Sequence, residues 1–264
     1  MKLNGAIHRV GLLAVVLCIA ACTPKLVVFD PPADRLEGLP DDAVALLEMS
    51  DQVAASHPST PAEADRGLAA AEKALSVGAD SPYEALWRVS RDAHTMADLI
   101  TQNAQREAYA KLGRKYGEQA SERDGARVEG WYYAAVNAAR EAEATSQTGP
   151  LSRVVEFAEK AIAIDPAYDD AAPLRLLGKV CMVAPEWPTS VGDRDKAVDL
   201  LKRAVGISAT PLNRLFLGQA LYHAEDHAGA AAQLRRALKD GEAGGLEKRW
   251  IEEAKDYLRR LGER

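Results

Sequence analysis

Apolar residues recur with the spacing of a helix through most of the chain, and residues 174–207 show this most clearly. In the first half of this stretch, four apolar or small residues follow the i, i+3, i+4, i+7 spacing of one helix face, namely Leu174, Leu177, Gly178 and Cys181. The second half repeats the pattern with Ala197, Leu201 and Ala204. Either helix alone would leave an apolar stripe in water. We therefore expect an antiparallel helix pair that stacks on similar pairs.

Other segments with the same period extend this pair into an array. The expected pairs are 41–56 with 61–77, 82–102 with 105–122, 128–143 with 151–164, the two halves of 174–207, and 212–223 with 228–239. Residues 246–261 form a last amphipathic helix, rich in charge and suited to cap an open end. We find no sustained alternation of β-branched residues that would indicate a sheet. The predicted fold class is all-α, with about five antiparallel helix pairs and a C-terminal capping helix.

The later pairs resemble the tetratricopeptide repeat (TPR). In the last pair, Leu217-Gly218 is followed 12 residues later by Ala230, as the TPR pattern requires. The equivalent spacing is 19 residues in the third and fourth pairs, so each carries seven extra residues between its helices. Arg214 stands where the repeat has its consensus Trp. The resemblance is good over 128–241 and weak before it, and the alternative is a helical bundle without repeats.

The N-terminus has the pattern of a bacterial secretory signal. Lys2 and Arg9 precede a short apolar run over 10–20, which is too short to span a membrane. Ile19-Ala20-Ala21-Cys22 resembles a lipobox, which implies cleavage before Cys22 and a covalent diacylglycerol and acyl chain on it. No other cofactor is expected. Thr23 follows where Asp would imply inner-membrane retention, so the resemblance implies an outer-membrane protein facing the periplasm. The alternative is ordinary secretion.

These features divide the chain into three parts. Residues 1–21 are the expected signal peptide, 22–40 a lipidated tether and 41–264 the TPR-like domain. Proline-rich composition and the absence of helical periodicity favour a tether over 24–40. An alternative is that Leu26-Val27-Val28-Phe29 pairs onto the body as an extended segment.

The lipobox, the divergent repeats and the phrase LLGKVCMVAPEWPTSVGDRDKAVDLLKRAV together resemble the TRAP-transporter T components. Mitochondrial and microtubule-associated TPR proteins share something like this phrase. The resemblance implies a lipid-anchored scaffold that binds a protein partner, the periplasmic solute-binding protein of a TRAP-type transporter, and it makes a homo-oligomer plausible. The competing function is a structural or assembly lipoprotein of the cell envelope with no role in solute uptake.

Composition and motifs argue against other classes. The formal net charge is −6, and it becomes −8 without Lys2 and Arg9, so no basic footprint for nucleic acid exists. His223 and His227 have an i, i+4 spacing but lack a third ligand, so no metal site is expected. No acid–base or nucleophile set emerges, and we expect no enzyme. Cys181 is interpreted as a small core residue.

In TPR arrays the first helices of successive pairs line a concave groove. Carrying the phase of Gly178 across the pairs selects Tyr132, Val136, Arg140, Arg175, Lys179, Met182, Gln219 and Tyr222 as candidate groove residues. In the second pair the same phase selects Tyr83, Leu86 and Ser90. Arg140, Arg175 and Lys179 would form a cationic strip for a carboxylate-bearing peptide, solute or partner. The alternative is that these cations are solvated and paired with Glu or Asp on the next helix.

Trp187 lies between two prolines in the insert 184–193. It could fold over the groove or contact a partner. The favoured expectation is that it covers the top of its own repeat, because Trp is highly buried on average.

Overall fold

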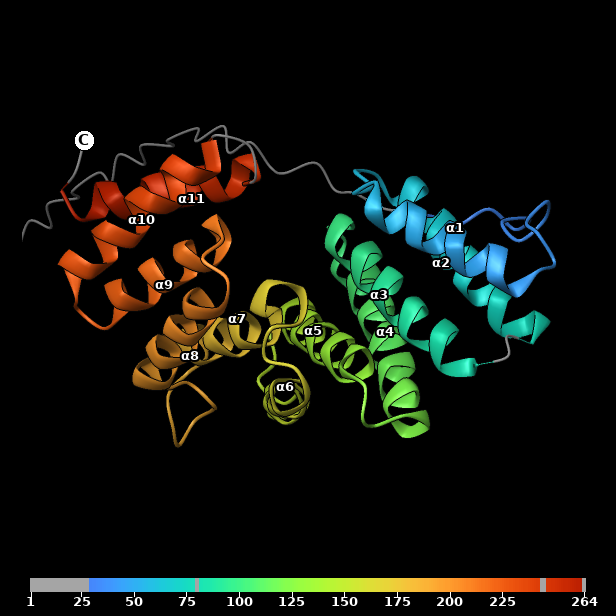
Figure 1. Ribbon diagram of the computed structural model, residues 1–264, viewed down its shortest axis with the longest axis horizontal. Helices are drawn as coiled ribbons and strands as arrows, with labels where there is room; N and C mark the ends of the chain where they lie inside the picture. Colours follow the sequence, from blue (N-terminus) through green and yellow to red (C-terminus); the bar gives the residue numbers. More distant parts are fainter. Residues whose placement is uncertain (1–28, 79–80, 243–245, 263–264) are drawn as a thin grey trace, which may run out of the picture.

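The computed structural model describes residues 29–78, 81–242 and 246–262 (Figure 1). Within these ranges the chain is all-helical, and one isolated bridge between Glu186 and Gly192 is its nearest approach to a strand. The helices are α1 (Ala43–Ala55), α2 (Pro61–Val77), α3 (Pro82–Leu99), α4 (Asn103–Arg123), α5 (Val128–Thr145), α6 (Leu151–Ile164), α7 (Tyr168–Val183), α8 (Arg194–Ile207), α9 (Pro211–His223), α10 (His227–Glu242) and α11 (Lys248–Arg260). The five predicted pairs and the capping helix are confirmed.

Local capping chemistry sets where several helices begin. Thr60 and Glu63 form a capping box at the start of α2, and Pro61 occupies its first turn. Asp42 accepts a hydrogen bond from the Ala45 N–H at 2.8 Å and caps α1. The helix therefore begins at Ala43, two residues after the predicted start at residue 41. Asp193 caps α8 in the same way.

The pairs follow an arc (Figure 1). Successive first helices touch one another, α1 with α3, α3 with α5, α5 with α7 and α7 with α9. In the described part of the chain, the second helices contact only the helices next to them in sequence. The first helices therefore form the inner, shorter face of the curve, and α4, α6, α8 and α10 lie outside it.

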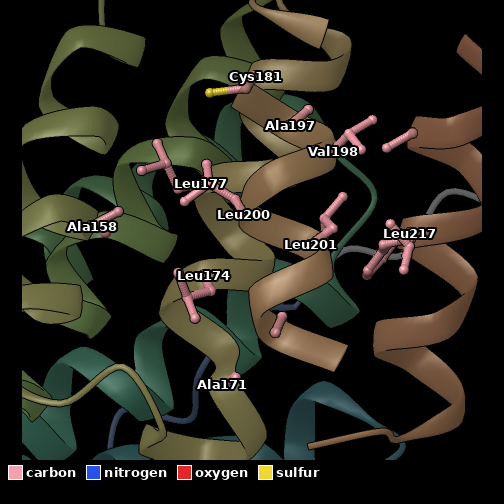
Figure 2. Packing of buried hydrophobic residues seen from close by; sticks show 14 of the residues in the cluster. Ala158, Ala171, Leu174, Leu177, Cys181, Ala197, Val198, Leu200, Leu201 and Leu217 are labelled. Carbon is pink, nitrogen blue, oxygen red and sulfur yellow. The ribbon is translucent and has the colours of Figure 1, made fainter. Parts of the chain in front are cut away.

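The largest core cluster fills the space between α7, α8 and α9 (Figure 2). Leu177, Leu201 and Leu217 are each at most 3% exposed there. Cys181 is 2% exposed in the same cluster, and burial raises the pKa of its thiol to about 11. The prediction that Cys181 is a small core residue is confirmed, and such a thiol is chemically inert at neutral pH.

The start of α7 differs from the sequence expectation. Asp169, Asp170 and Ala171 have positive φ angles of 47°, 56° and 62°, a left-handed turn that precedes the regular helix. This conformation costs about 1–2 kcal/mol per residue, so it needs external support. Asn213 of α9 supplies it, because its Nδ2 donates to the Asp170 carbonyl at 2.8 Å.

The segment before α1 packs on the body. The Phe29 N–H donates to Gln105 Oε1 at 3.0 Å, and Gln105 Nε2 donates to the Phe29 carbonyl at 3.1 Å. Arg35 pairs with the nearly buried Asp65 at 2.8 Å, and Lys73 donates to the Leu39 carbonyl. Of the segment 26–29 that could pair onto the body, the structure describes Phe29, and its backbone is held by the Gln105 side chain.

Several sequence expectations concern residues 1–28, which lie outside the described residues. They include the signal peptide, the lipidation site Cys22 and the pairing of 26–28. Among the residues that the structure does describe, no helix combines the length and apolarity needed to cross a membrane.

Candidate binding groove

A pocket of about 320 Å³ opens on the inner face between α5 and α7. We call it the α5–α7 pocket. Its lining residues are His94, Val136, Ala139, Arg140, Ala142, Glu143, Ser146, Gln147, Thr148, Leu151, Leu176, Lys179, Val180, Val183, Ala184 and Pro185. Three candidates chosen from the sequence, Val136, Arg140 and Lys179, therefore share one pocket. The volume lies at the lower end of the range for small-molecule sites.

The rim of the pocket comes from the two connections that are longer than in a plain TPR. Ser146, Gln147 and Thr148 belong to the connection between α5 and α6, and Ala184 and Pro185 begin the connection between α7 and α8. Both departures from the repeat pattern thus border the same cavity.

The longer of these connections is closed at its base. The Gly192 N–H donates to the Pro185 carbonyl at 2.9 Å, and the Asp193 N–H donates to the Cys181 carbonyl at 2.9 Å. These hydrogen bonds join the two ends of the loop. A side chain at Gly192 would clash with the Ala184 carbonyl, so this close approach requires glycine.

The two cations of the pocket have different surroundings. Arg140 donates to Asp98 and to Glu143, each at 2.5 Å, which is the paired alternative raised from the sequence. Lys179 makes no ion pair with any residue that the structure describes. Its Nζ lies 5.4 Å from the centroid of the Phe216 ring and 5.5 Å from that of Trp250. Lys179 is thus a partly buried cation without a carboxylate partner among the described residues.

His94 of α3 forms one wall of the pocket. Burial lowers its pKa to about 4, and the positive charge of Arg140 lowers it further, while Asp98 acts in the opposite direction. Its Nδ1 is buried and has no hydrogen-bond partner within the described chain. His94 is therefore neutral at physiological pH and presents a buried polar atom that no described residue satisfies.

Other candidate groove residues lie outside the pocket. Arg175 donates to Asn213 Oδ1 at 2.9 Å and to the Asp170 carbonyl, so it supports the turn at the start of α7. Tyr132 packs edge-on against Tyr168, and burial raises its pKa. Met182 packs against the core cluster. The expected three-residue cationic strip is thus divided, and Arg175 is not part of the pocket.

The capping helix covers the inner face of α9. Phe216 packs edge-on against Trp250, and Tyr222 against Tyr257 of α11. Gln219 is 2% exposed, and its Nε2 lacks a hydrogen-bond partner among the residues described. The predicted groove residue Tyr222 therefore faces the cap, and Gln219 is buried. His223 contacts Tyr257 as well, and no cluster of potential metal ligands occurs in the described ranges.

Sequence reasoning missed His94, Leu176 and Val183. Val183 is 64% exposed and stands one residue after the chosen Met182. The residues chosen in α3, Tyr83, Leu86 and Ser90, are buried and do not line the pocket. A row of residues spaced by four drifts about 40° around a helix at each step. The row that holds Leu86 and Ser90 therefore reaches the pocket at His94.

Trp187 is 84% exposed. The favoured expectation that it covers its own repeat is wrong, because a Trp packed on its repeat would lose most of that exposure. Its side chain is free to contact another molecule.

Comparison with known proteins places this fold. A family model described as regulator of microtubule dynamics protein 1-3 matches residues 46–188, more than half of the chain. The crystal structure of a thermophilic TPR protein from Thermus thermophilus is similar, with 20% identity and a TM-score of 0.59 over 84% of this chain and 97% of that one. No curated protein matches the chain. The fold is therefore TPR-like, and the chain belongs to the regulator of microtubule dynamics protein 1-3 family.

Proposed function

We propose that this protein is a lipid-anchored periplasmic scaffold that binds a protein partner on the inner face of its helical array. The α5–α7 pocket carries this proposal, because it combines apolar walls from Val136 and Val180 with the cation Lys179, which no described carboxylate neutralises. Concave surfaces of helical repeats are suited to hold an extended partner. TPR-like folds are in general protein-binding scaffolds, and the described residues of the groove assemble no catalytic set.

The proposed address rests on the resemblance of Ile19-Ala20-Ala21-Cys22 to a lipobox. Several acyl chains on Cys22 would hold the protein stably at a membrane. We propose the outer membrane, because Thr23 follows Cys22 where an Asp would imply retention at the inner membrane. The family description names regulators of microtubule dynamics. That activity is not part of the proposal, because the proposed address of this chain is the bacterial periplasm.

The proposed partner is the periplasmic solute-binding protein of a TRAP-type transporter, and the scaffold itself is proposed to form a homo-oligomer. This rests on the resemblance of residues 176–205 to the T components. The partner would enter between the α5–α7 pocket and Trp187, whose exposed side chain lies on the connection that forms the pocket rim.

The address is tested on the mature protein. Mass spectrometry of the full chain expressed with its own signal should find an N-terminal Cys22 carrying diacylglycerol and an acyl chain. A Cys22→Ser variant should lose both lipid and membrane attachment. A mature protein that starts elsewhere would exclude the anchor.

The partner is tested by photo-cross-linking in cells. A photoreactive amino acid at Val183, in the pocket, should capture a solute-binding protein. The matched control places it at Lys202, which is exposed on the outer helix α8. Capture of envelope-assembly proteins at Val183 would favour the structural lipoprotein, and capture only at Lys202 would exclude the inner face.

A further inference from the structure

We infer that the α5–α7 pocket binds a small aliphatic carboxylate, with the apolar chain between α5 and α7 and the carboxylate on Lys179. The inference deepens the proposed function, since it rests on the inner face being the recognition surface. It names what chemistry that surface recognises.

The walls of the pocket fit a short apolar chain. Val136, Leu151, Leu176 and Val180 line it, and a volume of about 320 Å³ equals the share of roughly ten water molecules in the liquid. An acid with about eight non-hydrogen atoms, such as hexanoate, matches this size. Val183, 64% exposed at the opening, is an apolar side chain that such a ligand would cover.

The charge of the pocket favours an anion. Among its lining residues, Arg140 and Glu143 neutralise each other at 2.5 Å, and neutral His94 adds no charge. Lys179 remains as the net charge, in a protein whose formal net charge is −6. A partly buried ammonium without a carboxylate partner in the described chain loses hydration that an anionic ligand would replace.

Two of the lining residues also carry a buried nitrogen that no described residue satisfies. Within the described ranges, His94 Nδ1 and Arg140 Nε are both buried without a hydrogen-bond partner. Among the described residues that line it, the pocket thus holds a cation without a carboxylate partner beside apolar walls.

The test is calorimetric titration of the purified protein with hexanoate. Two matched ligands serve as controls. Hexanamide has nearly the same shape as hexanoate but no charge, and acetate has the charge but lacks the apolar chain. Hexanoate should bind at least about tenfold more tightly than either, because a charge-assisted hydrogen bond and burial of the chain both contribute. Equal binding of hexanoate and hexanamide would overturn the inference.

Two variants locate the binding. Lys179→Met keeps the apolar stem beside Phe216 and should weaken hexanoate binding about tenfold or more. Val183→Asp, at an exposed position where folding is safe, should weaken it by charge repulsion. Lys202→Met on α8 is the control and should leave binding unchanged. Unchanged binding in both pocket variants would overturn the assignment.

A further titration with a peptide tests whether the carboxylate comes from a free solute or from the C-terminus of a partner protein. A tripeptide that ends in leucine is compared as the free acid and as the C-terminal amide. If the free-acid tripeptide binds more tightly than hexanoate, the pocket is assigned to the C-terminus of a partner chain. If hexanoate binds and the tripeptide does not, the pocket is assigned to a free solute. Neither result depends on the cross-linking partner, so the two proposals can fail separately.

Discussion

Gly178 of α7 and Leu201 of α8 are packed so closely that a Cβ on the glycine would lie 2.7 Å from Leu201 Cγ. Gly218 of α9 and Leu234 of α10 repeat this relationship at the same 2.7 Å. The longer connection in the earlier pair does not change it. At both positions glycine is needed because the two helices lie too close for a side chain. It is not needed for an unusual backbone conformation, since both glycines are helical.

Alanine at Gly178 should therefore destabilise the protein relative to alanine at Gly206. Gly206 lies in α8, and a Cβ added there would meet no atom within 4 Å, so Gly206→Ala gains only helix propensity, up to about 1 kcal/mol. Overpacking against Leu201 costs about 1–3 kcal/mol. Urea unfolding should place Gly178→Ala below Gly206→Ala by about that amount, and equal stabilities would contradict the packing.

A buried polar contact joins α3, α4 and α5. Asn137 Nδ2 donates to the Ser90 carbonyl at 2.9 Å, and Ser90 Oγ donates to the Gly113 carbonyl at 2.7 Å. A side chain at Gly113 would clash with the Asn137 amide. Gly113→Ala and Asn137→Ala should each destabilise by about 1–3 kcal/mol.

The double variant distinguishes this contact from unrelated losses. Asn137→Ala vacates the space that a Cβ at Gly113 would need, so Gly113→Ala should cost less in that background. Chemical denaturation of all four proteins gives the coupling energy, which should be at least about 0.5 kcal/mol. Simple additivity would exclude the contact.

Gln105→Ala should release the segment before α1. The side chain forms two hydrogen bonds with the Phe29 backbone, each contributing about 1 kcal/mol. Hydrogen exchange over residues 29–39 should become faster, while exchange in α7 and α8 stays unchanged. Gln52→Ala, at an exposed position on α1, is the control. Identical exchange in both variants would mean that Gln105 does not hold the segment.

His94 should make stability fall as the pH is lowered. Its pKa in the folded protein is lowered to about 4, below the value near 6.5 of an unfolded chain. Between these two values the unfolded state binds a proton that the folded state does not, so stability is lost as the pH falls from about 6.5 to 4. Urea unfolding at several pH values should show a shallower slope in His94→Gln. Coincident slopes would contradict the buried, neutral histidine.

Two tryptophans should respond differently to truncation. Trp187→Ala should change stability by no more than about 0.5 kcal/mol, because the side chain is 84% exposed. Trp250→Ala should cost about 2 kcal/mol or more, since it removes the contact of α11 with Phe216. Thermal unfolding measures both. A large loss at Trp187 would show that it is covered.

Periodicity was enough to predict the helices, because each buries an apolar stripe that can be recognised locally. The phase of each groove residue was harder to predict. Val183 and Met182 differ by about 100° around α7, and only the position of α5 decides which faces the pocket. His94 was missed for the same reason, since α3 matches the repeat pattern poorly.

The amino-acid sequence by itself determined the all-helical class, the five pairs and the cap. Of the eight groove residues chosen from the sequence, Val136, Arg140 and Lys179 line one pocket. Only the tertiary structure decided that Arg140 is paired, that Lys179 has no carboxylate partner in the described chain, and that α11 covers Tyr222. Helix formation depends on neighbours a few residues away, whereas the partner of a charge depends on side chains that folding brings from distant helices.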